Sequence, residues 1–522
     1  MLAEEPLALS PGSQGEAFQG CGDGHASTRE ILLGKDEGFF GVDRAGSRPL
    51  IPSPGWPAVM NNTPHSSHGG EAGRPAHRAD AAAEQGTTGA AGPAGRQHVA
   101  EGGDKGGKRE DGSAKANRSA SPHQEQGRPP AASQEAAVEH FVEFRVGAIY
   151  QLMEGKRLCL SVHREDGHTL QEIKRFPKLF FFSSDLQERY QSFCADFGPV
   201  NLGILHRFCQ FVHSKYTDPR LKSRTMVYYT DEDTAIRTNA AYLLGGYMML
   251  FHGLSPAEAW RPFSLIQPRP WQGFRDATYC APTYTICLLD CFEALYKAVQ
   301  LGWYRVADFD LEEYEYWEHP LNGDLHQLCP KFIAFKGPSA KRELIAPGFY
   351  TFQPHDYFEV FKERNVTAIC RLNEADTYDR ADFEKCGFNF FDLYFDDCTV
   401  PSEDVIEAFL DMTDAEAGVI AVHCKAGLGR TGTLIAIWMM KNYGWRADPC
   451  IAWLRIVRPG CVIGPQQEFL KQCEQITWEG NKPQWPDHLR GTIGLNNAEE
   501  SARLSLQVAE AMNIRGAERA AS

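Results

Sequence analysis

Residues 423–432 of this chain are His423-Cys424-Lys425-Ala426-Gly427-Leu428-Gly429-Arg430-Thr431-Gly432, a short glycine-containing loop between two apolar runs. The run at residues 418–422 predicts a buried strand, and the run at residues 433–440 predicts a helix. A strand, a tight loop and a helix N-terminus in this order bind anions, because the loop N–H groups and the helix dipole point at one spot. The stretch therefore predicts an α/β fold with an anion-binding loop.

The residue types in this loop add a specific chemistry. Cys424 lies where the positive field favours a thiolate, which can attack phosphorus. Arg430 offers a planar fork of donors that fits two phosphate oxygens. Gly427 and Gly429 allow a close approach of the backbone and positive φ angles. We predict that the phosphate-binding residues are Lys425, Ala426, Gly427, Leu428, Gly429 and Arg430.

Two neighbours of the loop have predicted supporting roles. The Thr431 hydroxyl is expected to contact the sulfur or a phospho-cysteine intermediate. His423 is expected to bond loop carbonyls or to reach the sulfur from behind. The alternative is a buried structural cysteine beside a surface arginine. Both glycines, His423 and the strand–helix context argue against that alternative.

Phosphate ester cleavage also needs a proton donor for the leaving oxygen. An aromatic-rich predicted strand at residues 391–395 ends in Asp396 and Asp397. Either carboxylate could act first as a general acid and then as a general base toward water. A pair of aspartates after a strand is also typical of a solvated turn. The residues alone leave the choice open.

The composition excludes several classes of protein. The net charge of -15 argues against non-specific nucleic-acid binding, and no apolar run reaches the ~18–20 residues that a membrane span needs. The first residues lack the pattern of a secretory signal. The 15 cysteines show no paired or metal-ligand spacing, which predicts a reducing compartment, nuclear or cytoplasmic. We expect no metal, no cofactor and no nucleic-acid partner, and the sequence makes no prediction of oligomeric state.

The chain changes character along its length. Residues 1 to about 137 are rich in Gly, Ala, Ser, Pro and charge, which predicts disorder. Alternating strand and helix patterns then continue to about residue 480. Beyond this point Leu504, Val508 and Met512 share a helical face, enough for a short docking helix. Strands are predicted at 146–150, 158–162 and 366–372, and helices at 243–251, 284–299, 404–413 and 450–457. Residues 350–364 are predicted to contain a further helix.

An earlier segment is similar to the loop described above. Residues 226–241 again combine a strand, a polar loop, Arg237-Thr238 and a helix of small residues. The position six residues before Arg237, which corresponds to Cys424, is Asp231. We interpret this segment as a second copy of the same domain without its nucleophile. The alternative is a chance similarity of two strand–loop–helix units.

Several segments together resemble the cell-division-cycle-fourteen family of dual-specificity protein phosphatases. The family implies two tandem phosphatase-like α/β domains, each a central mixed sheet flanked by helices, with only the second catalytic. The resemblance covers residues 138 to 478 and rests on 195–202, 237–241, 274–277, 322–325, 423–432, 458–460 and 463–467.

This resemblance divides the chain into five parts. We expect a disordered extension at 1–137, a non-catalytic phosphatase-like domain at 138–303, an acidic linker helix at 304–328, a catalytic dual-specificity domain at 329–480 and a tail at 481–522. The implied activity is metal-free hydrolysis of phosphoserine, phosphothreonine and phosphotyrosine in proteins. A role in the cell cycle and cell division is implied as well.

The resemblance also assigns residues. Its general acid falls on Asp397, 27 positions before Cys424, and a pair that positions the hydrolytic water falls on Gln466 and Gln467. The family favours phosphoserine followed by proline with a basic residue slightly further on. The acidic residues that select this basic residue correspond to Glu312, Glu315 and Asp324.

One residue departs from the family pattern. Cys398 stands where the family usually has glycine after the acid. It could stiffen the acid loop or trap Cys424 in a protective disulfide. A harmless small residue is the interpretation that we favour.

Two other functions compete with this prediction. Phosphoinositide phosphatases of the phosphatase-and-tensin type have a similar loop, but with a second lysine where this chain has Leu428. A non-catalytic phosphate-binding scaffold would have lost the cysteine, the arginine or the acid, and residues 329–480 keep all three.

Overall fold

The computed structural model describes residues 140–164, 166–346, 348–489, 501–507 and 510–511. The extension predicted to be disordered, residues 1–137, lies outside the described residues. Within them, no helix combines the length and the apolar character that a membrane crossing requires.

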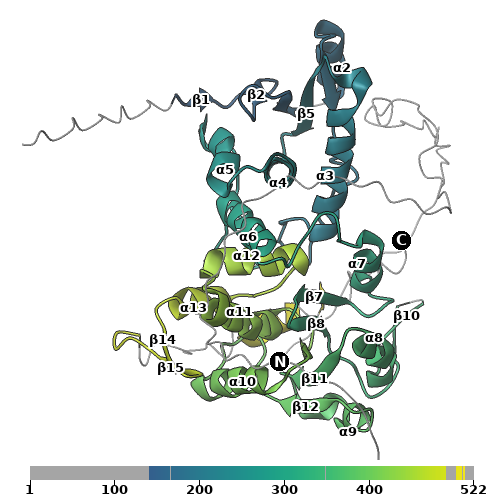
Figure 1. Cartoon of the computed structure of the whole chain (residues 1–522), viewed down its shortest axis with the longest axis vertical. Helices are drawn as coiled ribbons and strands as arrows, with labels where there is room; N and C mark the ends of the chain where they lie inside the picture. The colour runs from purple at the N-terminus through teal and green to yellow at the C-terminus, as the bar shows by residue number, and fades with distance from the viewer. Residues whose placement is uncertain (1–139, 165, 347, 490–500, 508–509, 512–522) are drawn as a thin grey trace, which may run out of the picture. The chain divides into compact units, whose positions relative to one another are not determined.

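The C-terminal half is built on a five-stranded sheet in the order β12-β11-β13-β8-β7 (Figure 1). The central strand β13 (Val419–Cys424) runs parallel to both neighbours, β11 (Val366–Arg371) and β8 (Phe332–Lys336). The edge strand β12 (Asn389–Asp392) is also parallel, and β7 (Leu325–Cys329) is antiparallel. The predicted strand–loop–helix unit is therefore at the centre of a mixed sheet.

The helices of this half follow its strands. The helix after the loop is α11 (Gly429–Tyr443). The others are η2 (Pro354–Tyr357), α8 (Phe358–Glu363), η3 (Ala375–Thr377), α9 (Ala381–Glu384), α10 (Glu403–Ala415), α12 (Ala447–Val457) and α13 (Pro465–Cys473). Short hairpins are β9 (Leu344–Ala346) with β10 (Phe349–Tyr350), and β14 (Thr477–Glu479) with β15 (Lys482–Gln484).

The N-terminal half repeats this plan on a four-stranded sheet in the order β2-β3-β5-β4. Strand β5 (Thr225–Asp231) lies between the parallel strands β3 (Leu158–His163) and β4 (Leu179–Phe182), and β2 (Ile149–Gln151) is antiparallel. The helices are α2 (Asp166–Arg175), α3 (Leu202–Thr217), η1 (Pro219–Leu221), α4 (Thr234–His252), α5 (Pro256–Ser264) and α6 (Leu288–Gln300). A small parallel pair joins β1 (Val142–Glu143) to β6 (Ile266–Gln267).

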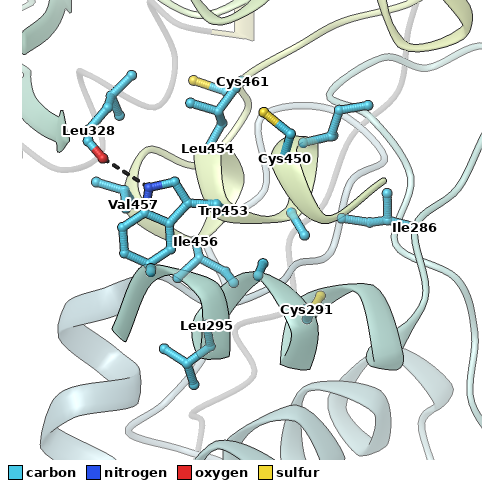
Figure 2. Packing of buried hydrophobic residues seen from close by; sticks show 14 of the residues in the cluster. Ile286, Cys291, Leu295, Leu328, Cys450, Trp453, Leu454, Ile456, Val457 and Cys461 are labelled. Carbon is cyan, nitrogen blue, oxygen red and sulfur yellow. Dashed lines mark hydrogen bonds between the residues drawn. The ribbon is translucent and has the colours of Figure 1, made fainter. Parts of the chain in front are cut away.

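Both halves are thus mixed sheets flanked by helices, as the predicted fold class requires. In each, the central strand leads into a long helix, α4 after β5 and α11 after β13. The two halves share a hydrophobic core, in which α6 packs against α12 (Figure 2). There the Trp453 ring lies among apolar side chains, and its Nε1 donates a hydrogen bond of 2.9 Å to the Leu328 carbonyl.

The helix predicted within residues 350–364 is confirmed as α8, which begins at Phe358 after a 3₁₀ turn that Pro354 opens. The predicted domain bounds stay a prediction. Strand β7, which pairs with the C-terminal sheet, begins at Leu325, within the predicted linker. The acidic linker helix α7 spans Leu311–Glu318.

Candidate active site

The loop after β13 has a backbone that only glycine fits at one position. Strand β13 ends at Cys424, and α11 begins at Gly429 without a side-chain cap on its N-terminus. Gly427 has φ +68°, and a Cβ atom there would overlap the carbonyl of Phe335 on the neighbouring strand β8. The first N–H groups of α11 are thus left without a side chain to accept from them, in the arrangement that binds anions.

Arg430 is buried at the start of α11, with an exposed fraction of 0%. Its Nη1 donates to the carbonyls of Leu372 (3.2 Å) and Phe395 (2.9 Å), and its Nε lies 3.2 Å from Asp397 Oδ1. Burial lowers the pKa of this guanidinium, but the nearby charges, those of Cys424 and Asp397 first, together outweigh burial and raise the pKa above its ordinary value. Arg430 is therefore held as a cation beside the sulfur.

Three buried donor atoms in this region have no hydrogen-bond partner among the described residues. They are Arg430 Nε, Arg430 Nη2 and the Thr431 hydroxyl. A buried donor without an acceptor costs about 1–3 kcal/mol. An oxyanion bound between the loop and α11 would remove this cost, and a phosphate offers enough acceptor oxygens for these donors.

Arg458 stabilises the loop through hydrogen bonds to its carbonyl groups. Its side chain is 1% exposed, and it donates to the carbonyls of Gly427 (2.8 Å) and Ala426 (2.9 Å). In a planar trans peptide the N–H points away from the carbonyl. Because Arg458 holds these two carbonyls, the N–H groups of the same peptides, those of Gly427 and Leu428, point away from it.

His423 is buried under the loop as a neutral ring. Its Nδ1 lies 3.0 Å from the Cys424 carbonyl, and its Nε2 lies 2.6 Å from the Tyr378 hydroxyl. Burial lowers the pKa of His423 to about 3. A neutral ring carries one proton, and the carbonyl can only accept, so Nδ1 donates and Nε2 accepts from Tyr378. The contact with a loop carbonyl is one of the two arrangements predicted from the sequence.

The two candidate acids have different surroundings. Asp397 Oδ1 faces Arg430 and accepts from the Cys398 N–H at 3.1 Å, and Asp397 Oδ2 accepts from the Ser505 hydroxyl at 2.7 Å. Asp396 instead accepts from the exposed Tyr394 hydroxyl at 2.6 Å. The geometry places Asp397, rather than Asp396, next to the predicted phosphate-binding arginine.

Cys398 has a left-handed backbone, with φ +57°. Glycine reaches this region without the steric cost that a Cβ atom brings, which explains why glycine suits the position. The side chain is 3% exposed, and burial, followed by the charge of Asp397, raises the pKa of its thiol. The disulfide with Cys424 stays a prediction, and the raised pKa slows any reaction that needs the Cys398 thiolate.

The two glutamines are buried but have different partners. Gln466 donates to the Thr399 carbonyl in the acid loop (2.9 Å) and accepts from the Ile463 N–H (3.0 Å). A Cβ atom added at Gly429 would lie 2.9 Å from Gln466 Oε1, so this amide borders the loop. Gln467 instead accepts from Arg455 at 2.7 Å. Gln466 contacts the acid loop, which suits its predicted role. Gln467 has no hydrogen bond to that loop among the described residues, so its predicted role has no such support.

The three acidic residues predicted to bind a basic substrate residue differ in whether their carboxylates already have a partner in the protein. Glu312 is exposed in the first turn of α7, where an acidic residue also stabilises the helix N-terminus. Glu315 forms an ion pair with Arg207. Asp324 Oδ1 accepts from Arg458 at 2.8 Å, so this carboxylate contacts the residue that braces the loop.

The N-terminal copy has the same strand–loop–helix framework, but its helix N–H groups and its arginine already have hydrogen-bond partners in the protein. Asp231 ends β5 as Cys424 ends β13. The Arg237 guanidinium is committed to the carbonyls of Glu232 (2.7 Å) and Pro270 (2.8 Å). The Asp233 carboxylate caps α4, accepting from the first N–H groups of the helix. An anion would meet a carboxylate here, which agrees with the predicted loss of catalytic function.

The N-terminal half nevertheless supports the candidate site. Asp276 is 4% exposed, and its Oδ2 accepts from the Gly464 N–H at 2.8 Å, just ahead of Gln466. A Cβ atom added at Gly460 would lie 2.9 Å from the Phe193 ring and 3.1 Å from Leu428. The segment that leads into α13, the helix of the two glutamines, is therefore in contact with residues of both halves.

Sequence reasoning missed three of these contributors. The bracing role of Arg458 was not predicted, although the residue lies in the segment 458–460 that carried the resemblance. The hydroxyls of Tyr378 and Ser505 had no sequence signal, because their partners lie far away along the chain. Their roles follow only from the packed structure.

Two family models match parts of the chain. A family model described as "Dual specificity protein phosphatase, N-terminal half" matches residues 153–298, and one described as "Polymorphic toxin system, DSP-PTPase phosphatase" matches residues 349–443. The crystal structure of Tk-PTP in the active form is similar at 22% identity and a TM-score of 0.24, over 29% of this chain and 95% of that chain.

Curated relatives match over both halves. The chain is 40% identical to the dual specificity protein phosphatase CDC14C of Homo sapiens over 350 residues, which are 66% of this chain and 76% of that protein. It is 42% identical to CDC14A of Mus musculus, over 58% of this chain and 50% of that protein. It is 39% identical to the tyrosine-protein phosphatase CDC14 homolog of Schizosaccharomyces pombe, over 62% and 60% of the two chains.

A cysteine at a strand end, a buried arginine and a nearby carboxylate are groups that a cysteine-dependent phosphatase uses, and the relatives are named protein phosphatases. The tandem arrangement and the relatives narrow this class. The chain belongs to the CDC14 family of dual specificity protein phosphatases.

Proposed function

We propose that this phosphatase cleaves phosphoserine and phosphothreonine followed by proline, with a basic residue further on, and also phosphotyrosine. The observation that carries the catalytic part is the set of buried donors on Arg430 and Thr431 that have no hydrogen-bond acceptor among the described residues. The Arg430 Nε lies 3.2 Å from the carboxylate of Asp397, which we assign as the acid.

The proposed reaction has two steps. In the first, the Cys424 thiolate attacks phosphorus and forms an S–P bond while the P–O bond to the substrate breaks. Asp397 gives its proton to the leaving oxygen, and Arg430 binds two of the remaining phosphoryl oxygens. In the second, Asp397 takes a proton from a water that Gln466 orients. That water attacks phosphorus, the S–P bond breaks, and phosphate leaves.

Replacing the nucleophile tests the catalytic assignment. We expect Cys424→Ser to lose at least about 10⁴-fold in kcat on p-nitrophenyl phosphate, because a serine hydroxyl is rarely ionised at neutral pH. Equilibrium binding of a phosphopeptide should survive, since the loop and Arg430 remain. Turnover by Cys424→Ser at the wild-type rate would disprove the mechanism, and Cys386→Ser is a matched control.

The preference for a basic residue is supported by the acidic face of α7. Glu312 is exposed, whereas Glu315 is paired with Arg207 and Asp324 with Arg458. We expect Glu312→Gln to reduce the preference for a lysine after phosphoserine-proline by about three- to tenfold, the effect of one partly screened charge. A library of phosphopeptides with lysine or alanine at successive positions measures this preference, and an unchanged profile would remove the assignment.

The relatives are named protein phosphatases, which favours a protein substrate over a phosphoinositide. Leu428, where the phosphatase-and-tensin type has a lysine, adds to this preference. Comparing kcat/KM on a phosphoserine-proline-lysine peptide with that on a phosphoinositide in vesicles decides between the two. A higher value on the lipid would overturn the proposal.

We also propose a role in cell-cycle regulation and a location in the nucleus, the cytoplasm or both. The cysteine pattern supports a reducing compartment, and the family name supports the cell cycle. Imaging of the tagged protein through one division cycle would test both points.

A further inference from the structure

The described part of the tail, residues 501–507 and 510–511, is helical and partly buried. Leu504, Ser501 and Ala511 are 3%, 6% and 4% exposed. Leu506 on the same helix is 61% exposed. The segment therefore has one face against the protein and one face toward solvent.

The buried face lies on the active site. A Cβ atom added at Gly464 would lie 3.0 Å from Leu504 Cδ1, so Leu504 borders the residue at which α13, the helix of Gln466, begins. Leu504 is also part of the main hydrophobic cluster. The apolar anchor of the segment is therefore next to residues that we assign to the second reaction step.

The polar contact of the segment is with the assigned acid. The Ser505 hydroxyl donates a hydrogen bond of 2.7 Å to Asp397 Oδ2, while Asp397 Oδ1 faces Arg430. In the first reaction step Asp397 gives its proton to a seryl oxygen. Immediately afterwards, that product hydroxyl faces the Asp397 carboxylate as Ser505 does here. Ser505 thus has the position of a product serine relative to the acid.

We propose that residues 501–507 are an intramolecular ligand of the active site. They place a seryl hydroxyl at the leaving-group position and are displaced by phosphoprotein substrates. The proposal rests on the proposed role of Asp397. A tethered segment has an effective concentration of the order of millimolar, so a weak contact suffices to occupy the site. The substrate then binds only to the fraction of molecules in which the segment is released.

Steady-state kinetics of the full-length protein test this competition. Leu504→Asp places a charge on the buried anchor and should release the segment. We expect KM for a phosphoserine peptide to fall by up to about tenfold with kcat unchanged, because apparent affinity scales with the competent fraction. Leu506→Asp puts the same charge on the exposed face and should leave KM unaltered. Equal KM values for wild type and Leu504→Asp would overturn the proposal.

Ser505→Ala separates the hydroxyl contact from the apolar anchor. We expect it to lower KM in the same direction as Leu504→Asp, by about three- to tenfold, the net value of a typical hydrogen bond. An unchanged KM in Ser505→Ala would contradict the leaving-group position of this hydroxyl.

Hydrogen exchange tests docking without catalysis. The amides of residues 501–507 should exchange faster in Leu504→Asp than in wild type. They should also exchange faster when Cys424→Ser protein is saturated with a phosphoserine peptide that it binds but does not cleave. Exchange that does not respond to the peptide would show a permanently packed helix. If wild type cleaves no phosphoester, the proposed function fails, yet this exchange still reports whether the segment docks.

Discussion

At the scale of single residues, Gly427 shows how the site depends on backbone that no side chain can replace. Its φ of +68° and the nearby Phe335 carbonyl leave no room for a Cβ atom. The same residue presents its carbonyl to Arg458 at 2.8 Å. One atom added here disturbs both the loop and its brace.

Gly427→Ala should therefore lose catalysis more than stability. We expect kcat/KM to fall at least about 100-fold, since a shift of about 1 Å in a reacting group has this effect. Gly444→Ala is the matched control, because Gly444 has φ +58° at the other end of α11 with nothing within 4 Å of an added Cβ atom. It should cost about 1–2 kcal/mol of stability and keep its activity. Similar kcat/KM values for the two variants would contradict the account of the loop.

His423 gives a pH dependence of a definite sign. Its pKa is lowered by burial from an ordinary 6.5 to about 3, so the folded protein keeps it neutral where the unfolded chain takes up a proton. The free energy of unfolding should thus fall as the pH falls from about 6.5 toward 3, by up to about 1.4 kcal/mol per pH unit from this group. Urea unfolding at pH 7, 6 and 5 measures the slope.

The contribution of His423 is isolated by comparison with His423→Gln, which cannot take up this proton. The variant should be less stable at pH 7 but should show a smaller loss between pH 6.5 and 5. Glu188 acts in the opposite direction, because burial raises its pKa from 4.5 to about 7. Identical slopes in the variant and in wild type would contradict the buried neutral histidine.

At the scale of elements, local patterns predicted the strand–loop–helix unit well. The apolar runs around residues 423–432 correspond to β13 and α11, and the predicted strand at 366–372 corresponds to β11. Such signals are local, because hydrophobic period depends only on near neighbours. The helix predicted within residues 350–364 is α8, and the turn that Pro354 opens before it was not predicted.

Contacts between distant segments were beyond local patterns. Arg458 contacts Gly427 and also Asp324, which lies 134 residues before Arg458 in the chain. Ser505 contacts Asp397, which lies 108 residues before it. Only the packed fold brings these side chains together. The resemblance to a family supplied the choice of Asp397, which the residues alone had left open. The roles of the site residues remain predictions for the experiments above.

At the scale of the whole molecule, a residue of the N-terminal half holds part of the candidate active site in place. Asp276 accepts a hydrogen bond from the Gly464 N–H and is itself 4% exposed. It therefore fixes the start of the segment that carries Gln466. In the proposed mechanism, Gln466 of that segment orients the water that attacks the phospho-cysteine in the second step.

Asp276→Ala should slow the second step in particular. We expect kcat to fall about tenfold, the value of one buried hydrogen bond to a charged group, with a burst of product equal to the enzyme concentration. Asp276→Asn keeps an acceptor oxygen and should restore most of kcat. Rapid-mixing kinetics with p-nitrophenyl phosphate would detect the burst. A uniform loss of folded protein without a burst would indicate a purely structural role.

The carboxylate of Asp233 on the first turn of α4 has an evolutionary consequence. A cysteine restored at position 231 would face a helix whose amides already have an acceptor and an arginine already tied to backbone carbonyls. Reviving that half would need several simultaneous changes, none useful alone. The loss of catalytic function in the N-terminal half is therefore difficult to reverse. The remaining role of this half is to support the C-terminal half.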